Sequence, residues 1–292
     1  MRAPQPGPEF QTKTVLAVDG QRLVVFEQGR GEPCFLLHGY PQTHRCWRGV
    51  AARLSKTHRV IAPDWFGSGE SERSLSSRPS YEREVARIGM VLDALRLDRV
   101  NYICHDYGGF LGLGFALAHE RRLLRLAVIN SRAQGNFAPF SYILFNAFSA
   151  IARLPGGEAM LALLPLYTMH RLSLQRYVAN GSFSQGDLEE YIGYMRTFAG
   201  RQWLGHVYRY FQATRRRALR EGLPKLRTPT AVIWGDRDPF SPVKIGMELA
   251  ALVPDATFHR LAGADHFSPE ERADEVSDAL LKLLSRPARD DG

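Results

Sequence analysis

One aspartate stands at an abrupt change of pattern in the sequence. In NYICHDYGGFLGL, residues 101–113, an apolar run ends at Asp106, Gly108 and Gly109 follow, and a helix-like pattern begins. A carboxylate is already ionised at pH 7 and needs no base to act as a nucleophile. Its attack on an sp3 carbon that bears a leaving group gives an ester, whereas attack on an acyl carbon gives a reactive anhydride. The sequence therefore favours alkyl transfer to Asp106 over hydrolysis of esters or amides.

Two groups that would complete such a site occur late in the chain. WGDRDPFSP contains Asp238 and AGADHFSPEE contains His266, each just after a predicted strand. A histidine oriented by a carboxylate can take a proton from water, and that water can then hydrolyse an ester on Asp106. Asp236 is the competing acid. The simpler alternatives are that Asp106 only caps a helix and that His266 is structural.

The composition is that of an ordinary globular protein. The 292 residues are 45% hydrophobic and 23% charged, which allows one or two domains with a substantial core. The net charge of +8 comes from scattered arginines, so we expect no binding to nucleic acid. The first residues are polar and proline-rich, and we expect no signal peptide, no membrane anchor and a cytoplasmic location. Cys34, Cys46 and Cys104 lack metal-like spacing and are expected to be reduced and structural.

The apolar patterns predict an α/β fold. Residues 12–29 alternate around Asp19-Gly20, which is a hairpin signal. Short runs typical of strands buried on both faces then alternate with amphipathic stretches, which indicates a mostly parallel sheet. Helices are predicted over 80–97 and 268–285. The predicted buried strands lie at 34–37, 59–64, 100–104 and 124–130, and strands return at 230–236 and 256–263.

Between residues 133 and 225 the strand signal disappears, and helical, aromatic-rich sequence takes its place. This segment, 133–225, is predicted to be an inserted helical cap. Residues 1–132 and 226–292 would then be the first and second parts of one core domain.

Three fragments of the first half resemble one enzyme family. They are HGYPQT at 38–43, PDWFGSGES at 63–71 and HDYGG at 105–109. Together with the late acid and histidine, they make residues 12–285 resemble α/β-hydrolases of the branch with an aspartate nucleophile, which contains epoxide hydrolases and haloalkane dehalogenases. The resemblance implies an α/β-hydrolase fold, with a mostly parallel eight-stranded sheet flanked by helices and a helical cap. It implies no metal and no organic cofactor.

The resemblance also implies a catalytic triad of Asp106, Asp238 and His266. The family's spacing from Gly235 favours Asp238 over Asp236 as the acid. Residue 104 is Cys where the family has a small residue, which is a modest departure.

The residues around Asp106 help to distinguish epoxide hydrolase from dehalogenase activity. The family places its oxyanion-hole donors at the backbone N–H groups of Tyr40 and Tyr107. Haloalkane dehalogenases carry a Trp after the nucleophile to hold the halide, and this chain has Tyr107 there. Fluoroacetate dehalogenases use an Arg after the nucleophile, and neither Tyr107 nor Phe110 supplies such a charge.

Cap tyrosines favour epoxides, because a phenol is protonated at pH 7 and can donate to the oxygen of an opening ring. In GHVYRYF, Tyr208 resembles one of the two cap tyrosines of epoxide hydrolases. Its partner is Tyr142 or, alternatively, Tyr167. Tyr167, His105 and Trp203, the only tryptophan of the predicted cap, are expected to line or support the substrate site.

The predicted function is the opening of epoxides to vicinal diols through an ester on Asp106 that water activated by His266 hydrolyses. The main alternative is a haloalkane or haloacid dehalogenase with the same triad. A catalytically silent member of the fold that binds a small molecule is the alternative from another class. The expected partners are a small apolar organic substrate and water, with no nucleic acid and no membrane, and the expected state is a monomer or a homodimer.

Overall fold

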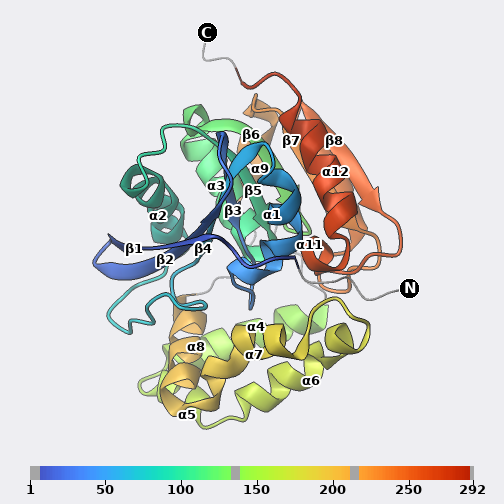
Figure 1. The fold of residues 1–292 in the computed structure, drawn as a ribbon. Coiled ribbons are helices and arrows are strands. Elements are labelled where there is room, and N and C mark those ends of the chain that lie inside the picture. The colour runs from blue at the N-terminus through green and yellow to red at the C-terminus, as the bar shows by residue number, and fades with distance from the viewer. Residues whose placement is uncertain (1–6, 133–138, 211–216, 290–292) are drawn as a thin grey trace.

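The computed structural model describes residues 7–132, 139–210 and 217–289, and within them the chain forms one mixed sheet of eight strands (Figure 1). The strand order is β1-β2-β4-β3-β5-β6-β7-β8. β2 runs antiparallel to its neighbours β1 and β4, and the pairs from β4 through β8 are parallel. The predicted fold class is thereby confirmed. The strands are β1 (Thr12–Val18), β2 (Gln21–Gln28), β3 (Glu32–Leu37), β4 (His58–Asp64), β5 (Val100–His105), β6 (Leu123–Ile129), β7 (Thr230–Gly235) and β8 (Ala256–Leu261).

The opening hairpin forms where the sequence predicts it. Asp19 and Gly20 have φ angles of 52° and 72°, the left-handed pair that a two-residue turn needs to match the twist of β1 and β2. The central strands β5 and β7 are buried along their whole length, as their continuous apolar runs predict.

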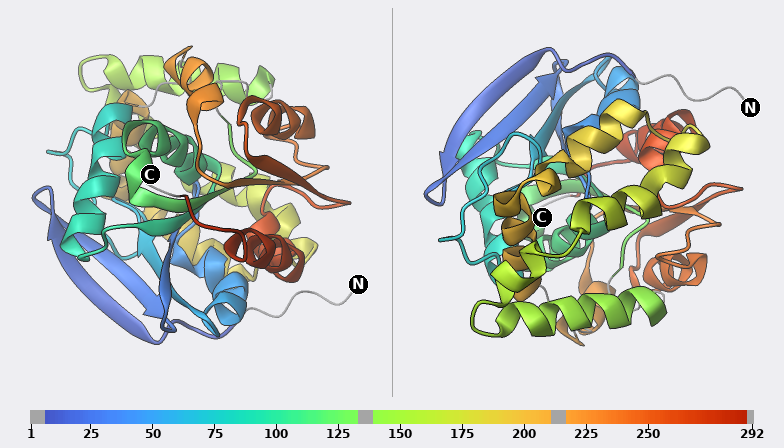
Figure 2. Two further views of the ribbon diagram at one scale, coloured as in Figure 1. Left: turned by 90° about the horizontal axis from the view of Figure 1, so that it is seen from above. Right: turned by 90° about the horizontal axis from the view of Figure 1, so that it is seen from below.

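Helices cover both faces of the sheet (Figure 2). Each face has its own apolar cluster, and a fully buried Leu, Ile or Val in such a cluster stabilises the fold by roughly 1.5–3 kcal/mol. One face carries α2 (Tyr81–Ala94), α3 (Asp106–Ala118), α9 (Arg217–Gly222) and α10 (Val243–Leu252); the other carries α1 (Arg48–Leu54), α11 (Ser268–Glu271) and α12 (Ala273–Leu284). Short 3-10 turns lie at His44–Trp47, Glu120–Arg122, Gly193–Arg196 and Leu223–Lys225.

One of the two helices predicted from the sequence forms as expected, and the other is interrupted. The helix predicted over 80–97 begins after Ser80, whose side chain accepts a hydrogen bond from the N–H of Arg83. The helix predicted over 268–285 is broken into α11 and α12, because Arg272 leaves the helical conformation with φ −131° and ψ 41°. The three cysteines are buried and unpaired, as expected.

A layer of helices lies against one end of the core, at the bottom of Figure 1. It has its own apolar cluster, which the core residue Phe267 joins by packing on Tyr177 with ring centroids 4.6 Å apart. Residues 217–225 pack instead with α3 of the core, through Leu219 and Leu223. The helices of this cap are α4 (Pro139–Arg153), α5 (Gly157–Ala162), α6 (Leu166–Ala179), α7 (Gln185–Ile192) and α8 (Phe198–Tyr210).

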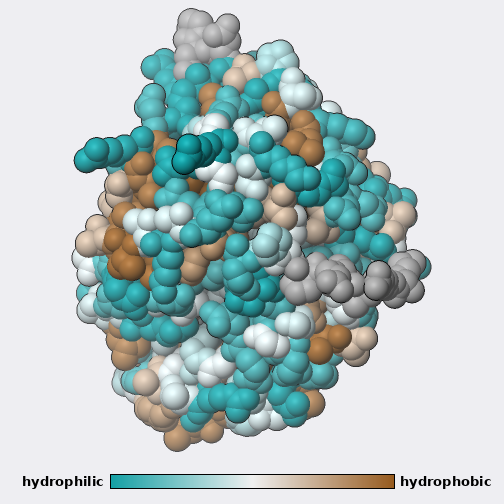
Figure 3. Space-filling view, in the orientation of Figure 1, coloured by the Kyte–Doolittle hydropathy of each residue, from teal (hydrophilic) through white to brown (hydrophobic). Residues whose placement is uncertain are grey.

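The face of the molecule seen in Figure 3 is largely hydrophilic, with small separate apolar areas. Among the helices described, none is both long enough and apolar enough to span a bilayer.

Candidate active site

The turn between β5 and α3 holds Asp106 in a strained backbone conformation. Its φ of 47° lies in the left-handed region, which costs a residue other than glycine about 1–3 kcal/mol. Other segments of the same chain approach this turn so closely that only glycine fits at two positions. A Cβ at Gly108 would lie 2.5 Å from the carbonyl oxygen of Leu37, and one at Gly39 would lie 2.4 Å from Cβ of Asp106. The predicted strained corner is therefore present, and it fixes the direction of the carboxylate.

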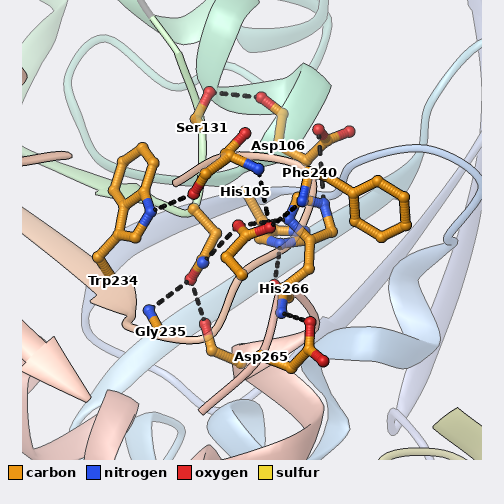
Figure 4. A network of polar contacts seen from close by, with 12 residues as sticks. His105, Asp106, Ser131, Trp234, Gly235, Phe240, Asp265 and His266 are labelled. Atoms are coloured by element: carbon orange, nitrogen blue, oxygen red, sulfur yellow. Dashed lines mark hydrogen bonds and ion pairs between the residues drawn. The ribbon is translucent and has the colours of Figure 1, made fainter. Parts of the chain in front are cut away.

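The structure brings the three predicted triad residues together. Figure 4 shows Asp106 and His266 within the network of polar contacts around them. Nδ1 of His266 lies 2.7 Å from Oδ2 of Asp238, and Nε2 of His266 lies 3.6 Å from Oδ2 of Asp106. Asp236, the competing acid, accepts hydrogen bonds from Arg260 and from the N–H of Gly263 instead. The geometry thus separates the two aspartates and places Asp238 beside the histidine.

Asp238 is held by donors that leave it little freedom. The N–H groups of Phe240 and Ser241 both donate to its Oδ1 at 2.8 Å. The side-chain amide of Asn130 donates to Oδ2, also at 2.8 Å, and the hydroxyl of Ser268 donates to Oδ1 of Asn130 at 2.7 Å. Asn130 was not among the site residues predicted from the sequence. Its position directly after a buried strand was the available signal.

Charges around the site set the ionisation of the nucleophile and of the histidine. Burial alone would raise the pKa of Asp106, but His266, Arg132 and the N–H of Tyr40 outweigh it and hold this pKa below its usual value. Burial opposes the charged form of His266, yet the anionic Asp238 and Asp106 raise the pKa of His266 above its usual value. Asp106 is therefore ionised at neutral pH.

One of the two predicted oxyanion donors contacts the nucleophile directly. The backbone N–H of Tyr40 donates to Oδ1 of Asp106 at 3.0 Å, so this oxygen is held while Oδ2 faces His266. Tyr107 occupies the first turn of α3, and its role as second donor stays a prediction.

Three phenols, the buried Tyr208 and the partly buried Tyr40 and Tyr194, interact where the cap meets the core. The Tyr40 hydroxyl lies 2.7 Å from Nε2 of His170, whose Nδ1 contacts the carbonyl oxygen of Leu166 at 2.7 Å. Nδ1 must donate to that carbonyl, so Nε2 accepts from Tyr40. Tyr194 and Tyr208 interact electrostatically with the Tyr40 hydroxyl. Burial raises the pKa of both, so they are protonated at neutral pH. Tyr208 was predicted from the sequence, and Tyr194 was not.

The remaining predicted cap residues have other surroundings. The hydroxyl of Tyr167 donates to Glu189 at 2.6 Å and accepts from Arg196 at 2.5 Å, on the exterior of the cap. We therefore leave Tyr167 out of the site, as a correction to the expectation above. Trp203 is buried with its indole against Gly67 of the core. Tyr142 lies in α4, but its side chain is outside the described residues.

His105 lies next to His266 and contacts its backbone. Its Nδ1 lies 2.8 Å from Oε1 of Gln42, and its Nε2 lies 2.9 Å from the carbonyl oxygen of His266. Burial, together with the charge of His266, lowers the pKa of His105 to about 4, so it is neutral. Gln42 also donates to Glu270 at 2.5 Å, and burial raises the pKa of Glu270 to about 8. His105 thus contacts the backbone of His266, which agrees with the supporting role among the two roles expected of it.

A buried cation that acts electrostatically on the nucleophile is a third group not predicted from the sequence. The Arg132 side chain is only 6% exposed, and its Cζ lies 5.4 Å from the centroid of the Phe110 ring. It interacts electrostatically with Asp106 and Tyr107, while burial lowers its pKa to about 10, so it stays charged at pH 7. A positive charge from the segment after β6 therefore acts on Asp106.

Comparison with known proteins gives the family. Residues 33–273 match the family model described as alpha/beta hydrolase fold, and the chain belongs to that family. Together with the fold and the site geometry, this defines the protein as a hydrolase of the α/β-hydrolase superfamily.

Its relatives have several activities. The chain is 29% identical to 2-hydroxymuconate semialdehyde hydrolase of Pseudomonas putida, with 98% of each chain covered. It is 27% identical to haloalkane dehalogenase 2 of Mycobacterium bovis, covering 89% of this chain and 91% of that protein. It is 26% identical to cis-3-alkyl-4-alkyloxetan-2-one decarboxylase of Shewanella oneidensis, covering 89% and 84%. The solved structure of the epoxide hydrolase CorEH shares the fold, with a TM-score of 0.74, 22% identity and coverage of 94% and 98%.

Proposed function

We propose that the protein opens epoxides to vicinal diols through an alkyl ester on Asp106. The observation that carries this proposal is the placement of the Asp106 carboxylate, with Oδ1 on the N–H of Tyr40 and Oδ2 3.6 Å from His266. A carboxylate in this position is a nucleophile for sp3 carbon and needs no deprotonation.

In the first step, Oδ2 of Asp106 attacks one ring carbon of the epoxide. The carbon–oxygen bond of the ring breaks, and the electron pair stays on the ring oxygen. Tyr208 or Tyr194 donates a proton or a strong hydrogen bond to that oxygen. Their burial among apolar residues of the cap keeps the phenols protonated and so supports this role.

In the second step, His266 takes a proton from water, and the resulting hydroxide attacks Cγ of Asp106. The negative charge that develops on Oδ1 is stabilised by the N–H of Tyr40 and, we infer, by that of Tyr107. Collapse of this intermediate breaks the bond between Cγ and Oδ2, and the protonated His266 returns its proton to the leaving diol oxygen. The second proton of the water, left on the Asp106 carboxyl, passes to the phenolate formed in the first step and restores the resting state. Asp238 stabilises the protonated histidine throughout.

Dehalogenation is the second candidate, and it is favoured by the relation to haloalkane dehalogenase 2. The same two steps would serve, with a halide ion as the leaving group. The tyrosine at position 107 and the phenol pair of the cap favour epoxides, because an alkoxide needs a proton and a halide does not.

The two candidates can be separated by trapping the ester. We expect the His266→Gln variant, which lacks the base for the second step, to accumulate a covalent adduct with a small epoxide by intact-mass spectrometry. The mass gain should equal that of the epoxide and should vanish in the double variant with Asp106→Asn. A debrominated alkyl adduct from a bromoalkane, without an epoxide adduct, would favour dehalogenation. No adduct from a broad panel of both classes would indicate a silent member of the fold.

A further inference from the structure

Three side chains form a continuous path to the backbone of the proposed base. Oε2 of Glu270 lies 2.5 Å from Nε2 of Gln42, and Oε1 of Gln42 lies 2.8 Å from Nδ1 of His105. Nε2 of His105 lies 2.9 Å from the carbonyl oxygen of His266 (Figure 4). Gln42 and His105 are fully buried, whereas Glu270 is half-buried and lines a cavity between the cap and the core. The path therefore joins a titratable carboxyl group to the segment that carries His266.

The two ring nitrogens of His105 both face oxygen atoms, namely Oε1 of Gln42 and the carbonyl oxygen of His266. A neutral imidazole has only one N–H group and can donate to only one of them. With Gln42 in this orientation, the other contact of a neutral His105 places two lone pairs against each other. Exchanging the oxygen and the NH₂ group of the Gln42 amide removes the conflict, because the NH₂ group then donates to Nδ1 while Nε2 donates to His266.

The turned amide requires a proton on Glu270. The Gln42 oxygen then faces Oε2 of Glu270, and two oxygen atoms form a hydrogen bond only when one of them carries a proton. The hydroxyl of Tyr191 donates to Oε1 of Glu270 at 2.7 Å, which leaves Oε2 as the protonated oxygen. Burial raises the pKa of Glu270 to about 8 and lowers that of His105 to about 4. Both directions agree with a proton on Glu270 and a neutral His105 at pH 7.

Other elements bring charges of both signs to Glu270. Asp187 of α7 favours the protonated form, and Arg48 of α1 favours the ionised form. Arg48 is itself paired, with Asp187 at 2.6 Å and with Glu9 at 2.8 Å. Burial raises the pKa of the nearby Cys46 thiol, so this group is neutral. The charged or titratable groups that act on His105 are His266, Asp106 and Asp238.

We infer that Glu270 is a positioning residue of ester hydrolysis, which as a neutral carboxylic acid orients Gln42 so that His105 donates to the backbone of His266. The inference rests on the proposed function, because His266 acts as the base only in the second step. When Glu270 releases its proton to solvent, the NH₂ group of Gln42 turns to the carboxylate and its oxygen faces His105. The single proton of His105 then moves from Nε2 to Nδ1, and the hydrogen bond to His266 is lost. Ester hydrolysis slows in consequence, while alkylation of Asp106 does not.

The protonation states can be measured in the resting protein. We expect infrared difference spectra between the wild-type protein and Glu270→Gln to contain the carbonyl band of a protonated carboxylic acid at about pH 6 and to lack it at about pH 10. Nitrogen NMR of wild-type His105 should show its proton on Nε2 at the lower pH and on Nδ1 at the higher pH. Absence of the band at the lower pH, or a proton that stays on Nε2, would overturn the inference. Neither measurement depends on whether an ester forms on Asp106.

Single-turnover kinetics test the consequence for catalysis. We expect ester hydrolysis by the wild-type protein to slow about tenfold between about pH 7 and about pH 10, the size expected for one lost hydrogen bond, while ester formation stays nearly constant. Glu270→Gln keeps an uncharged donor toward Gln42 and should remove this fall. Glu270→Leu has no donor and should slow hydrolysis by about the same factor already at pH 7. A fall that persists unchanged in Glu270→Gln would overturn the inference, because a merely structural role does not depend on this proton.

A second variant changes the titration and keeps Glu270. Tyr191→Phe removes a donor that stabilises the Glu270 carboxylate, so the pKa of Glu270 should rise and the fall in hydrolysis should move to higher pH. Tyr167→Phe is the matched control, because this cap phenol donates to Glu189 and should leave the fall in place. A fall at the same pH in both variants would contradict the role of Glu270. If the spectra change as expected but no ester is ever trapped, the link from Glu270 to His105 stands and the proposed function fails.

Discussion

His266 and Asp106 face each other at 3.6 Å between Nε2 and Oδ2, within the range of an ion pair but beyond that of a hydrogen bond. The Asp106 charge is one of the causes that raise the pKa of His266. When Asp106 becomes an ester, this contribution disappears and the neutral form of His266 becomes more stable. Alkylation of the nucleophile therefore prepares the histidine to act as the base for the next step.

The first prediction concerns this coupling. Asp106→Asn removes the same charge as ester formation, so we expect the pKa of His266 to fall relative to the wild-type protein. The Asp238, Asp265 and His105 groups around the ring are unchanged in the variant. An NMR titration of the His266 ring measures the shift, and an unchanged or higher pKa would show that the two groups are not coupled.

The second prediction separates the two chemical steps through Asp238. We expect Asp238→Asn to slow ester hydrolysis by about 10³-fold or more, because the protonated His266 loses its stabilising anion. The first step should persist, since Asp106 needs no base. Rapid-quench experiments should therefore give a burst of one adduct per enzyme. Asp236→Asn is the control and should turn over normally, since Asp236 pairs with Arg260 instead; a matching defect there would contradict the assignment of the acid.

The third prediction concerns the phenols. In the His266→Gln background, we expect Tyr208→Phe and Tyr194→Phe each to slow ester formation from an epoxide about tenfold, and the pair together to slow it more, since each supplies a donor. Ester formation from a bromoalkane should change little. Tyr167→Phe serves as the control, because its hydroxyl is engaged by Glu189 and Arg196. If all three variants form the ester from an epoxide at the same rate, Tyr208 and Tyr194 do not act as proton donors.

The fourth prediction concerns stability. Burial raises the pKa of Glu270 from 4.5 to about 8, although Tyr191 and Gln42 donate to its carboxylate. A raised pKa means that the folded state binds the proton more tightly than the unfolded state does, so this contribution to stability is complete below pH 4.5 and is lost as the pH rises to about 8. We expect Glu270→Gln to flatten the pH dependence of the free energy of unfolding over this window.

Chemical denaturation at several pH values measures this difference. Glu248→Gln, on the exposed face of α10, is the control and should follow the wild-type curve. A Glu270→Gln curve that keeps the wild-type slope between pH 4.5 and pH 8 would contradict the raised pKa.

The sequence predicts the parts of this protein that local patterns determine. Continuous apolar runs identify the strands that are buried on both faces, and the glycines after Asp106 identify the tight turn. Spacing after the late strands also locates Asp238 and His266, because each follows a strand end at the same edge of the sheet.

Groups that reach the site from other segments were not predictable in this way. Asn130 and Arg132 matter only because β6 lies beside both β5 and β7, so that the residues after it contact Asp238 and approach Asp106. Tyr194 joins Tyr208 only through the packing of the cap helices. Tyr167 has a suitable residue type and spacing, yet its face of α6 points toward Glu189, which helical periodicity alone does not reveal.

The central claim is that the oxygen added to the product in a given turnover comes from Asp106 and not directly from water. A single turnover of an epoxide in H₂¹⁸O, with enzyme in excess, tests this most directly. The ester mechanism predicts an unlabelled diol and one ¹⁸O atom in the peptide that contains Asp106. A labelled diol with unlabelled Asp106 after that first turnover would mean that water attacks the epoxide itself, and it would contradict the mechanism.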